Sequence, residues 1–406
     1  MMPKTNNIPE VRFAGFTDAW EQRKLGEVAT YRRGSFPQPY GKSEWYDGDG
    51  AMPFVQVADV SDEMNLVEET KQKISILAQP MSVFAEKNSV LVTLQGSIGR
   101  VAIMQYGAFV DRTVLIFEKY KAEIDKTFWA YIIKQKFIDE ARKAPGGTIK
   151  TITKEALSDF DLSIPKYQEQ KQIGAYFRNL DNLITLHQRK YERLKNVKKS
   201  MLEKMFPKNG SNIPEIRFAG FTDAWEQRKL SDLIIEYKET VDSDCTLPVL
   251  TSSKTEGVVL QEEHFGRVQN HDITGYNILP RNYCTYRNRS DGVDFTFNIN
   301  RCCDKGIISK FYPVFYGNNS DIFFISMVLN YCDEVVHEIA YTCTGTGQKV
   351  LSFLDLQKMN IRVPSYDEQK KISQYFEQLD NLITLHQRKL EKLQNIKKSM
   401  LEKMFV

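Results

Sequence analysis

Two long segments of the chain place an apolar residue at every third or fourth position, and this spacing predicts two long helices. In the first segment these positions, with one histidine among them, are Ile173, Phe177, Leu180, Ile184, His187, Tyr191, Leu194, Met201 and Met205. In the second they are Ile372, Phe376, Leu379, Ile383, His386, Leu390, Leu393, Met400 and Met404. A three-four alternation kept over about five heptads is typical of a coiled-coil seam. In a helix, about 39 residues span roughly 58 Å.

Each of these helices alone would expose its apolar stripe to water, so each needs a partner. Because the chain carries two matching stripes, we expect them to pair with each other as an antiparallel intramolecular coiled coil, which relates the two halves by a pseudo-two-fold axis. The positions expected at the interface are Ile173, Phe177, Leu180, Ile184, His187, Leu194, Ile372, Phe376, Leu379, Ile383, His386 and Leu393. For the two histidines, fixing the register is favoured over metal binding or acid–base chemistry.

The same two blocks of sequence occur twice. IPEVRFAGFTDAWEQRKL at 8–25 returns as IPEIRFAGFTDAWEQRKL at 213–230, with one change in 18 positions. The helical block from Ile164 returns from Val363 with 31 identities in 43 positions. The enclosed inserts, 28–163 and 233–362, share little identity. Near-identical frames around divergent inserts indicate one structural task performed twice and two related tasks on different ligands, whereas a simple repeated fold would not explain such abrupt borders.

These borders divide the chain into four parts: 1–163 and 208–362, each an insert with its preceding frame, and the long helices 164–207 and 363–406. The junction PKNGSN at 207–212 is typical of a turn or a short linker. Pro165 and Pro364 precede the helices at positions where proline is tolerated. Two domains on two helices are therefore expected.

Both inserts show a mixed α/β (α+β) pattern. In the first, strands are predicted within 51–60, 89–104 and 108–120, followed by a helix over 127–143. In the second, strands are predicted within 282–289, 295–302 and 306–316, followed by one helix over 322–339. Each insert ends with a glycine turn and a strand that leads into the frame.

Charge is unevenly distributed along the chain, whose formal net charge is only +3. Residues 164–206 carry ten Lys/Arg against four Asp/Glu, whereas 28–163 has 17 against 18 and 233–362 has 12 against 16. The inserts are therefore not basic overall, and a nucleic acid would have to be held by local clusters or with help from partners. The lysines of the KKSM segments form a solvated helix face, with a phosphate-facing role as the alternative.

Side chains suited to base edges cluster near the glycine turns of both inserts. Arginine pairs bidentately with guanine and glutamine with adenine, while glycines let the backbone approach phosphates. The candidates in the first insert are Arg32, Arg33, Gln95, Ser97, Arg100 and Lys150. Those in the second are Arg287, Asn288, Arg289, Arg301, Lys305, Gln348 and Lys349. An ordinary surface or structural role remains the alternative for each of them.

Other chemistry finds little support in the sequence. The six cysteines all lie in the second half and none forms a C-x-x-C pair, which favours reduced structural thiols over zinc or disulfides. Pro37-Gln38-Pro39-Tyr40 lacks the acidic or amide residue and the Pro-Pro pair of an amino-methyltransferase motif. The spacing before Gly41-Lys42-Ser43 does not fit a phosphate loop. With no signal peptide and no apolar run that could span a membrane, a cytoplasmic, non-catalytic protein without a metal or a cofactor of its own is expected.

The alternation of frame, divergent insert and long helix, present twice, resembles the specificity subunits of Type I restriction–modification systems. The residues that carry the likeness are FxxLDNLITLHQRK in both helices, GSIGRVAI at 96–103, and the paired segments GGTIKTI at 146–152 and GTGQKVLS at 345–352. The resemblance covers essentially the whole chain.

This resemblance implies that the two inserts are target recognition domains, each reading one half of a split, asymmetric double-stranded DNA site. The paired helices would set the spacer, with half-sites centred roughly one helical turn apart. Two modification subunits using S-adenosylmethionine would dock on the helices and methylate adenine, and restriction subunits would add ATP- and Mg-dependent translocation and cleavage. A coiled-coil adaptor with two protein-binding inserts is the alternative from another class, and a self-sufficient methyltransferase is disfavoured by the absent motifs.

Overall fold

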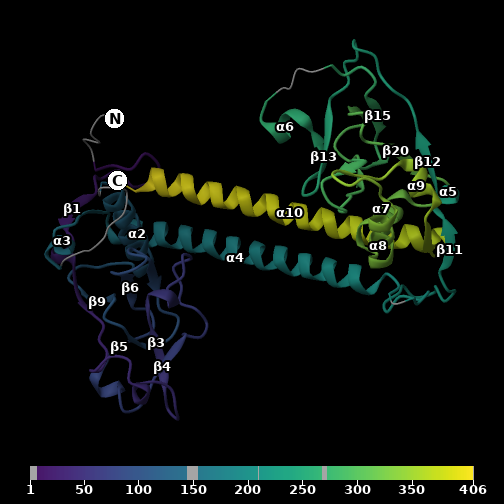
Figure 1. Ribbon diagram of the computed structural model, residues 1–406. Coiled ribbons are helices and arrows are strands. Elements are labelled where there is room, and N and C mark those ends of the chain that lie inside the picture. The colour runs from purple at the N-terminus through teal and green to yellow at the C-terminus, as the bar shows by residue number, and fades with distance from the viewer. Residues whose placement is uncertain (1–6, 144–153, 209, 268–271, 406) are drawn as a thin grey trace. The chain divides into compact units, whose positions relative to one another are not determined.

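The chain is described by a computed structural model that covers residues 7–143, 154–208, 210–267 and 272–405 (Figure 1). Its residues fall into two compact units, 1–189 with 387–406, and 190–386. Each unit therefore holds one insert, the beginning of one long helix and the end of the other. In the described ranges, no helix combines the length and the apolar character needed to cross a membrane.

The first unit is an α/β domain built on two four-stranded sheets, with strand orders β2-β9-β6-β7 and β4-β3-β8-β5. Helix α2 packs against β6 and β7, and Phe128 and Trp129 of this helix are fully buried in the core. The elements in chain order are β1 (Glu21–Lys24), α1 (Leu25–Val28), β2 (Ala29–Arg33), β3 (Met52–Val55), β4 (Gln72–Ile74), β5 (Val83–Ala85), β6 (Val90–Thr93), β7 (Val101–Ile103), β8 (Ala108–Val110), β9 (Val114–Tyr120), α2 (Lys126–Lys143), α3 (Lys154–Ser158), β10 (Asp161–Ile164) and α4 (Tyr167–Lys204).

The second unit repeats this plan with shorter strands, and its four-stranded sheet has the order β12-β20-β16-β18. Helix α7 packs against β16, β18 and β20, as α2 packs on its own sheet. The elements are β11 (Glu226–Lys229), α5 (Leu230–Leu233), β12 (Ile234–Tyr237), β13 (Leu250–Ser253), β14 (Gly257–Leu260), α6 (Gln261–Phe265), β15 (Asn277–Pro280), β16 (Cys284–Thr285), β17 (Arg289–Ser290), β18 (Asn298–Ile299), β19 (Lys305–Ile308), β20 (Val314–Gly317), α7 (Ile322–Tyr331), α8 (Asp333–Thr342), β21 (Lys349–Val350), α9 (Phe353–Lys358), β22 (Asn360–Val363) and α10 (Tyr366–Met404).

The expectation of one helix over 322–339 was wrong, because the helix breaks at Cys332. This residue is extended (φ −82°, ψ 109°) and serves as both the C-cap of α7 and the N-cap of α8. Its carbonyl accepts hydrogen bonds from the backbone N–H groups of Val335 and Val336 at 3.0 and 2.9 Å. Asp333 and Glu334 follow directly, and acidic residues favour the first turn of a helix. This pair of acidic residues was the signal in the sequence that a second helix begins there.

The repeated frame of the first unit holds the start of α4 and the end of α10 together. Nε and Nη2 of Arg12 donate to the two carboxylate oxygens of Glu169 in α4, at 2.8 and 2.7 Å. The N–H of Val11 donates to the carbonyl of Lys403 in α10 at 3.1 Å. Beyond α10, the ring of Phe405 stacks on Phe128 of α2, with centroids 5.8 Å apart. The last residues of α10 are therefore part of the core of the first unit.

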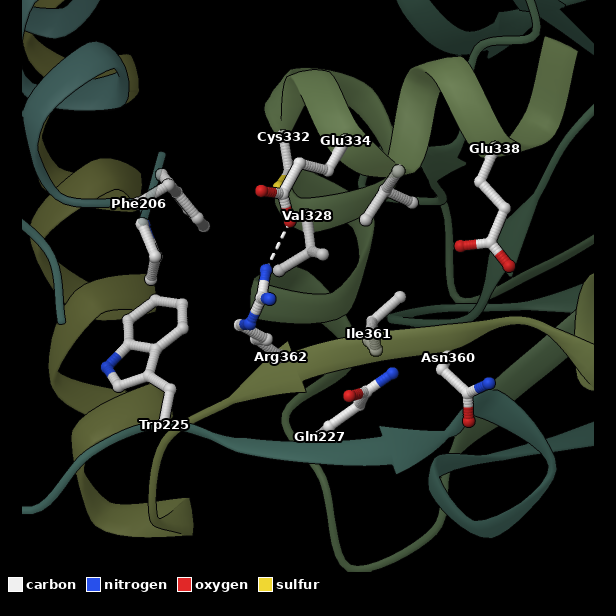
Figure 2. Close-up of a pocket in the computed structure, with 12 residues that line it drawn as sticks. Phe206, Trp225, Gln227, Val328, Cys332, Glu334, Glu338, Asn360, Ile361 and Arg362 are labelled. Carbon is white, nitrogen blue, oxygen red and sulfur yellow. Dashed lines mark hydrogen bonds and ion pairs between the residues drawn. The ribbon is translucent and has the colours of Figure 1, made fainter. Parts of the chain in front are cut away.

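The second unit repeats these contacts with the end of α4. Arg217 donates to both oxygens of Glu368 at 2.7 and 2.6 Å, and the N–H of Ile216 donates to the carbonyl of Lys204 at 2.9 Å. Phe206 stacks on Phe324 of α7, with centroids 5.9 Å apart. Figure 2 shows Phe206 and Trp225 beside a cavity of about 130 Å³ between α7, α8 and the strands β11 and β22. The frames are nearly identical because they bury nearly identical helix ends.

In each unit the two long helices run antiparallel to one another. Within the first unit, Phe177 of α4 packs near Phe405, and Asp181 one turn later pairs with Lys397 at 2.5 Å. The contact thus moves forward along α4 and backward along the C-terminal segment that includes α10. Within the second unit, Lys198 pairs with Asp380 at the same distance. The predicted helices, their antiparallel pairing and the mixed α/β fold are confirmed.

Breaking either of the two frame clasps, which are the ion pairs Arg12–Glu169 and Arg217–Glu368, leaves a buried carboxylate without its partner. The Glu169 side chain is 2% exposed and the Glu368 side chain 1%. We expect Arg12→Ala and Arg217→Ala each to lower the free energy of unfolding by about 3–5 kcal/mol, because removing one partner strands an uncompensated carboxylate. Urea unfolding measures this. Arg23→Ala, which breaks the exposed pair with Glu21, is the control and should change the free energy by less than about 1 kcal/mol. Equal effects of all three variants would contradict the structural role of the clasp.

Gly174 of α4 is fitted to its own insert. A Cβ atom there would lie 2.4 Å from Oδ1 of Asp125 and 3.1 Å from the N of Phe128. That Asp125 oxygen caps α2 by accepting from the N–H groups of Thr127 and Phe128 at 3.0 and 2.9 Å. We expect Gly174→Ala to destabilise the chain by about 1–3 kcal/mol through overpacking, although alanine is the better helix former. Thermal or urea unfolding measures the change.

The corresponding residue of α10 provides the matched control. Ser373 already carries a Cβ and donates its hydroxyl to Oδ1 of Asp321, the N-cap of α7, at 2.5 Å. Ser373→Ala should therefore lower the free energy of unfolding by about 1 kcal/mol, because the hydrogen bond is lost and no clash is introduced. A stabilising Gly174→Ala would show that Asp125 moves away without loss.

Candidate nucleic-acid interface

The structure brings several candidates of the first insert to one end of the sheet β2-β9-β6-β7. Arg32 and Arg33 end β2, and Gln95 and Ser97 lie exposed in the connection from β6 to β7. The N–H of Gly34 donates to the carbonyl of Val114 at 3.0 Å, and that of Leu94 to Thr113 at 2.8 Å. These bonds align the segments 33–35, 94–97 and 112–114. Lys150 lies outside the described residues.

Gly34 allows this approach of the strands. A Cβ at this position would lie 2.0 Å from the carbonyl oxygen of Val110 and 2.5 Å from that of Asp111. Any side chain would therefore push the end of β2 away from the connection between β8 and β9. Because Gly34 follows Arg33 directly, this close approach fixes the position of the exposed end of β2.

Two candidate arginines of the first insert are held by carboxylates. Nε of Arg32 lies 2.6 Å from Glu118, and Nε of Arg100 lies 2.9 Å from Asp62. In contrast, Arg112 has no ion-pair partner among the described residues, and its guanidinium stands 4.8 Å from the ring centroid of Phe36. Arg112 was not among the residues predicted from the sequence, because a place in a turn between two strands does not by itself distinguish it from an ordinary turn residue.

In the second insert the structure gathers five of the seven candidates around a two-stranded ribbon, β17–β21. The pairs are Arg289 with Val350 and Ser290 with Lys349. Arg287 and Asn288 precede β17, and Gln348 precedes β21. Arg287 and Arg289 are exposed, whereas Oδ1 of Asn288 is buried and finds no hydrogen-bond partner in the described structure.

Arg301 and Lys305 lie on other segments of the second insert. Arg301 forms an ion pair with Glu377 of α10 and donates to Oδ1 of Asn282 at 2.6 Å. Its guanidinium also lies 5.5 Å from the ring centroid of Phe323. Lys305 opens β19, opposite Pro280. These contacts tie Arg301 to the packing of the insert on its helix.

A cleft of about 420 Å³ adjoins the ribbon. It is lined by Ser252, Lys254, Arg287, Arg289, Ser290, Asp291, Gly292, Asp294, Phe295, Thr296 and Tyr312. Asp294 pairs with Lys254 and accepts from Oγ of Ser290 at 3.1 Å. These hydrogen bonds, the one from Lys254 foremost, hold the pKa of Asp294 below its usual value. Burial raises the pKa of Tyr312 against the opposing effect of Arg287, so this phenol stays protonated at neutral pH.

The two inserts place their candidates in equivalent connections. In the first sheet the connection runs from the third strand, β6, to the fourth, β7, and in the second sheet from β16 to β18. The first carries Gln95, Ser97 and Arg100, and the second carries Arg287, Asn288 and Arg289. The same position on the same fold thus bears different side chains in the two inserts.

The expected interface positions on the long helices fall into two groups. Those in the first turns are buried: Ile173, Phe177, Leu180, Ile372, Phe376 and Leu379. Those farther along are half-buried: Ile184, His187, Leu194, Ile383, His386 and Leu393. The leucines beside the seam remain exposed, Leu183 at 44%, Leu186 at 46%, Leu382 at 43% and Leu385 at 45%.

A duplicated α/β chain on paired helices, with equivalent polar connections in both halves, defines a class of two-site recognition proteins. The family model for the Type I restriction modification DNA specificity domain matches residues 17–196 and 304–395. The chain belongs to this family of Type I restriction–modification specificity subunits, as the resemblance in the sequence indicated.

Relatives match over nearly the full length. Two specificity subunits from Methanocaldococcus jannaschii, of the Type I restriction enzyme MjaVIII and of the putative enzyme MjaX, are each 22% identical over 98% of this chain and 95% of the relative. The crystal structure of the S subunit of a Type I restriction–modification system from M. genitalium covers 98% of this chain and 99% of its own, with a TM-score of 0.61 and 13% identity. That likeness shows the shared fold.

Proposed function

We propose that the chain directs a Type I restriction–modification complex to a split DNA site, with each insert reading one half. The observation that carries the proposal is the pair of equivalent connections, β6 to β7 and β16 to β18, which differ in their polar side chains. The two units share their frames, so the two half-sites are met in the same way. Because the reading residues differ, the target is asymmetric, with unspecified bases between its halves.

The electrostatics support local rather than general attraction to DNA. Many cations of the inserts are neutralised within the chain, as Arg32, Arg100 and Arg301 are by Glu118, Asp62 and Glu377. Arg112, Arg287 and Arg289 have no carboxylate partner in the described structure. Guanidinium groups of this kind are free to contact phosphates or base edges. A few such contacts per half-site suffice when partner subunits add further positive charge.

We assign methyl transfer and DNA cleavage to partner subunits and give this chain no catalytic role. S-adenosylmethionine would be held by modification subunits, and ATP and Mg²⁺ by restriction subunits. We assign to the chain the choice of target, and to its long helices of 38 and 39 residues the spacing of the half-sites. We place its action in the cytoplasm.

Two duplicated grooves are the proposed seats of two modification subunits. One, of about 380 Å³, is lined in part by Asp181, Ile184, Lys397, Lys398, Leu401 and Glu402. The other, of about 540 Å³, is lined in part by the corresponding residues Asp380, Ile383, Lys198, Lys199, Leu202 and Glu203. Since the lining repeats although the inserts differ, the same partner segment fits both. The exposed pairs Leu183–Leu186 and Leu382–Leu385 add apolar surface on the same helices.

Exchange of one insert tests the division of labour. Replacing residues 233–377 by those of a relative should change one half-site and leave the other intact, as read by methylome sequencing of the host. The exchanged segment extends into α10 because Ser373 and Glu377 contact Asp321 and Arg301 of the insert. The matched control replaces residues 28–178, which should change the opposite half-site. If either exchange alters both halves, the inserts do not read independently.

A gel shift separates the DNA-reading function from an adaptor function. The purified chain is tested alone and with a modification subunit. One DNA probe carries the target sequence identified in the methylome, and the other carries the same bases in scrambled order. We expect the complex to bind the target sequence at least ten-fold more tightly than the scrambled one. Equal affinity for both DNAs would contradict the proposal and favour an adaptor that binds proteins.

A further inference from the structure

We propose that the ribbon β17–β21 enters the major groove of the half-site read by the second insert and that Arg289 reads a guanine there. This inference rests on the proposed function, since it takes double-stranded DNA as the ligand. It goes beyond that function by naming one reading residue, its base and the element that delivers it.

The ribbon has the shape and the support that such a role needs. The major groove admits a two-stranded ribbon, and β17 and β21 form one in antiparallel register. Its base is fixed to the core: the N–H of Leu351 donates to the carbonyl of Asn288 at 3.0 Å, and the hydroxyl of buried Tyr286 donates to the carbonyl of Leu351 at 3.1 Å. A rigid support keeps the exposed side chains in a fixed position.

Two exposed arginines flank a partly buried residue at the start of the ribbon. Asn288 lies at a bend just before β17 and its Oδ1 is buried, whereas Arg287 and Arg289 on either side of it are exposed. Both arginines line the 420 Å³ cleft, and Lys349 lies across from Ser290 in the ribbon.

The acidic groups of the cleft already have partners, whereas its arginines do not. Asp294 is engaged by Lys254 and Ser290, and Asp291 accepts from Nε2 of Gln348 at 3.4 Å. In the same unit Arg217, Arg281, Arg301 and Arg362 each pair with a carboxylate. Arg287 and Arg289 have no such pair among the described residues. The insert has more acidic than basic residues, yet these two arginines are left without a carboxylate. We therefore infer that they donate hydrogen bonds to acceptors on a bound ligand.

Arg289 is the better placed of the two to read a base. Its guanidinium stands 4.5 Å from the ring centroid of Phe311, and stacking of this kind holds the planar fork in one orientation. A fixed fork matches O6 and N7 of guanine, whereas a phosphate needs only charge. Arg287 lies just before the ribbon, and no aromatic ring among the described residues stacks on it, so we assign it to a neighbouring phosphate.

Two substitutions separate these roles in the complete complex with its modification subunits. Arg289→Lys keeps the charge but removes the fork, so discrimination at one G·C pair of that half-site should fall about ten-fold, with the opposite half-site unchanged. Arg287→Ala should weaken binding to all sequences and reduce the slope of log K against log salt by about one. Arg281→Ala, which removes an exposed arginine already paired with Asp304, is the control and should do neither.

Binding to a panel of single-base variants and methylome sequencing give the readouts. Unchanged discrimination in Arg289→Lys, or a half-site without a G·C pair, would overturn the assignment of Arg289. Loss of thermal stability in Arg289→Lys would instead assign the residue to the packing of Phe311. If the unmodified complex shows no sequence preference at all, the proposed function itself fails, and that outcome is distinct from a selective complex whose variants behave normally.

Discussion

Burial of the ends of the long helices is the constraint on which the rest of this molecule depends. Each helix block finishes in Met-Phe, and Phe405 and Phe206 are buried against aromatic residues of a recognition domain. In the first unit Phe405 stacks on Phe128, and in the second Phe206 stacks on Phe324. The core of each domain is therefore completed by a residue far away in the chain: Phe405 is 277 positions after Phe128, and Phe206 is 118 positions before Phe324. Neither insert has its full core without both helices, which accounts for frames that stay alike around inserts that differ.

The proposed DNA-reading role requires a domain without net positive charge to offer a few uncompensated cations. Ion pairs within each unit hold many basic side chains, and two of the insert arginines without a carboxylate partner in the described structure stand over aromatic rings. Arg112 stands over Phe36 and Arg289 over Phe311. A ring orients a guanidinium without neutralising it, so the charge stays available to an external ligand. Specificity in such a design comes from orientation, and total charge is a poor guide to it.

The frames and helices could be predicted from the sequence because heptad spacing and internal repetition are local signals. The pairing of individual charges could not. Arg100 meets Asp62, 38 positions earlier, and Arg301 meets Glu377, 76 positions later. Only the fold brings such partners together, so arginines that look alike in the sequence divide into paired and unpaired ones. Arg112 was missed for the same reason: nothing in the sequence distinguishes it from an ordinary turn residue until Phe36 is placed beside it. The helix break at Cys332 did have a local signal, the acidic residues Asp333 and Glu334. The continuous apolar pattern on both sides obscured it.

The differences between the two frames carry as much information as their identity. Twelve of the 43 paired positions of the helix block differ, and some of these contact the inserts. Gly174 leaves room for the capping Asp125, whereas its counterpart Ser373 donates to the capping Asp321. Arg178 donates to Thr127, whereas its counterpart Glu377 pairs with Arg301. The first turns of each helix have thus diverged with the insert, while the final turns have stayed the same. The boundary of an exchangeable module therefore lies inside the helix, beyond its third turn, and not at the proline before it.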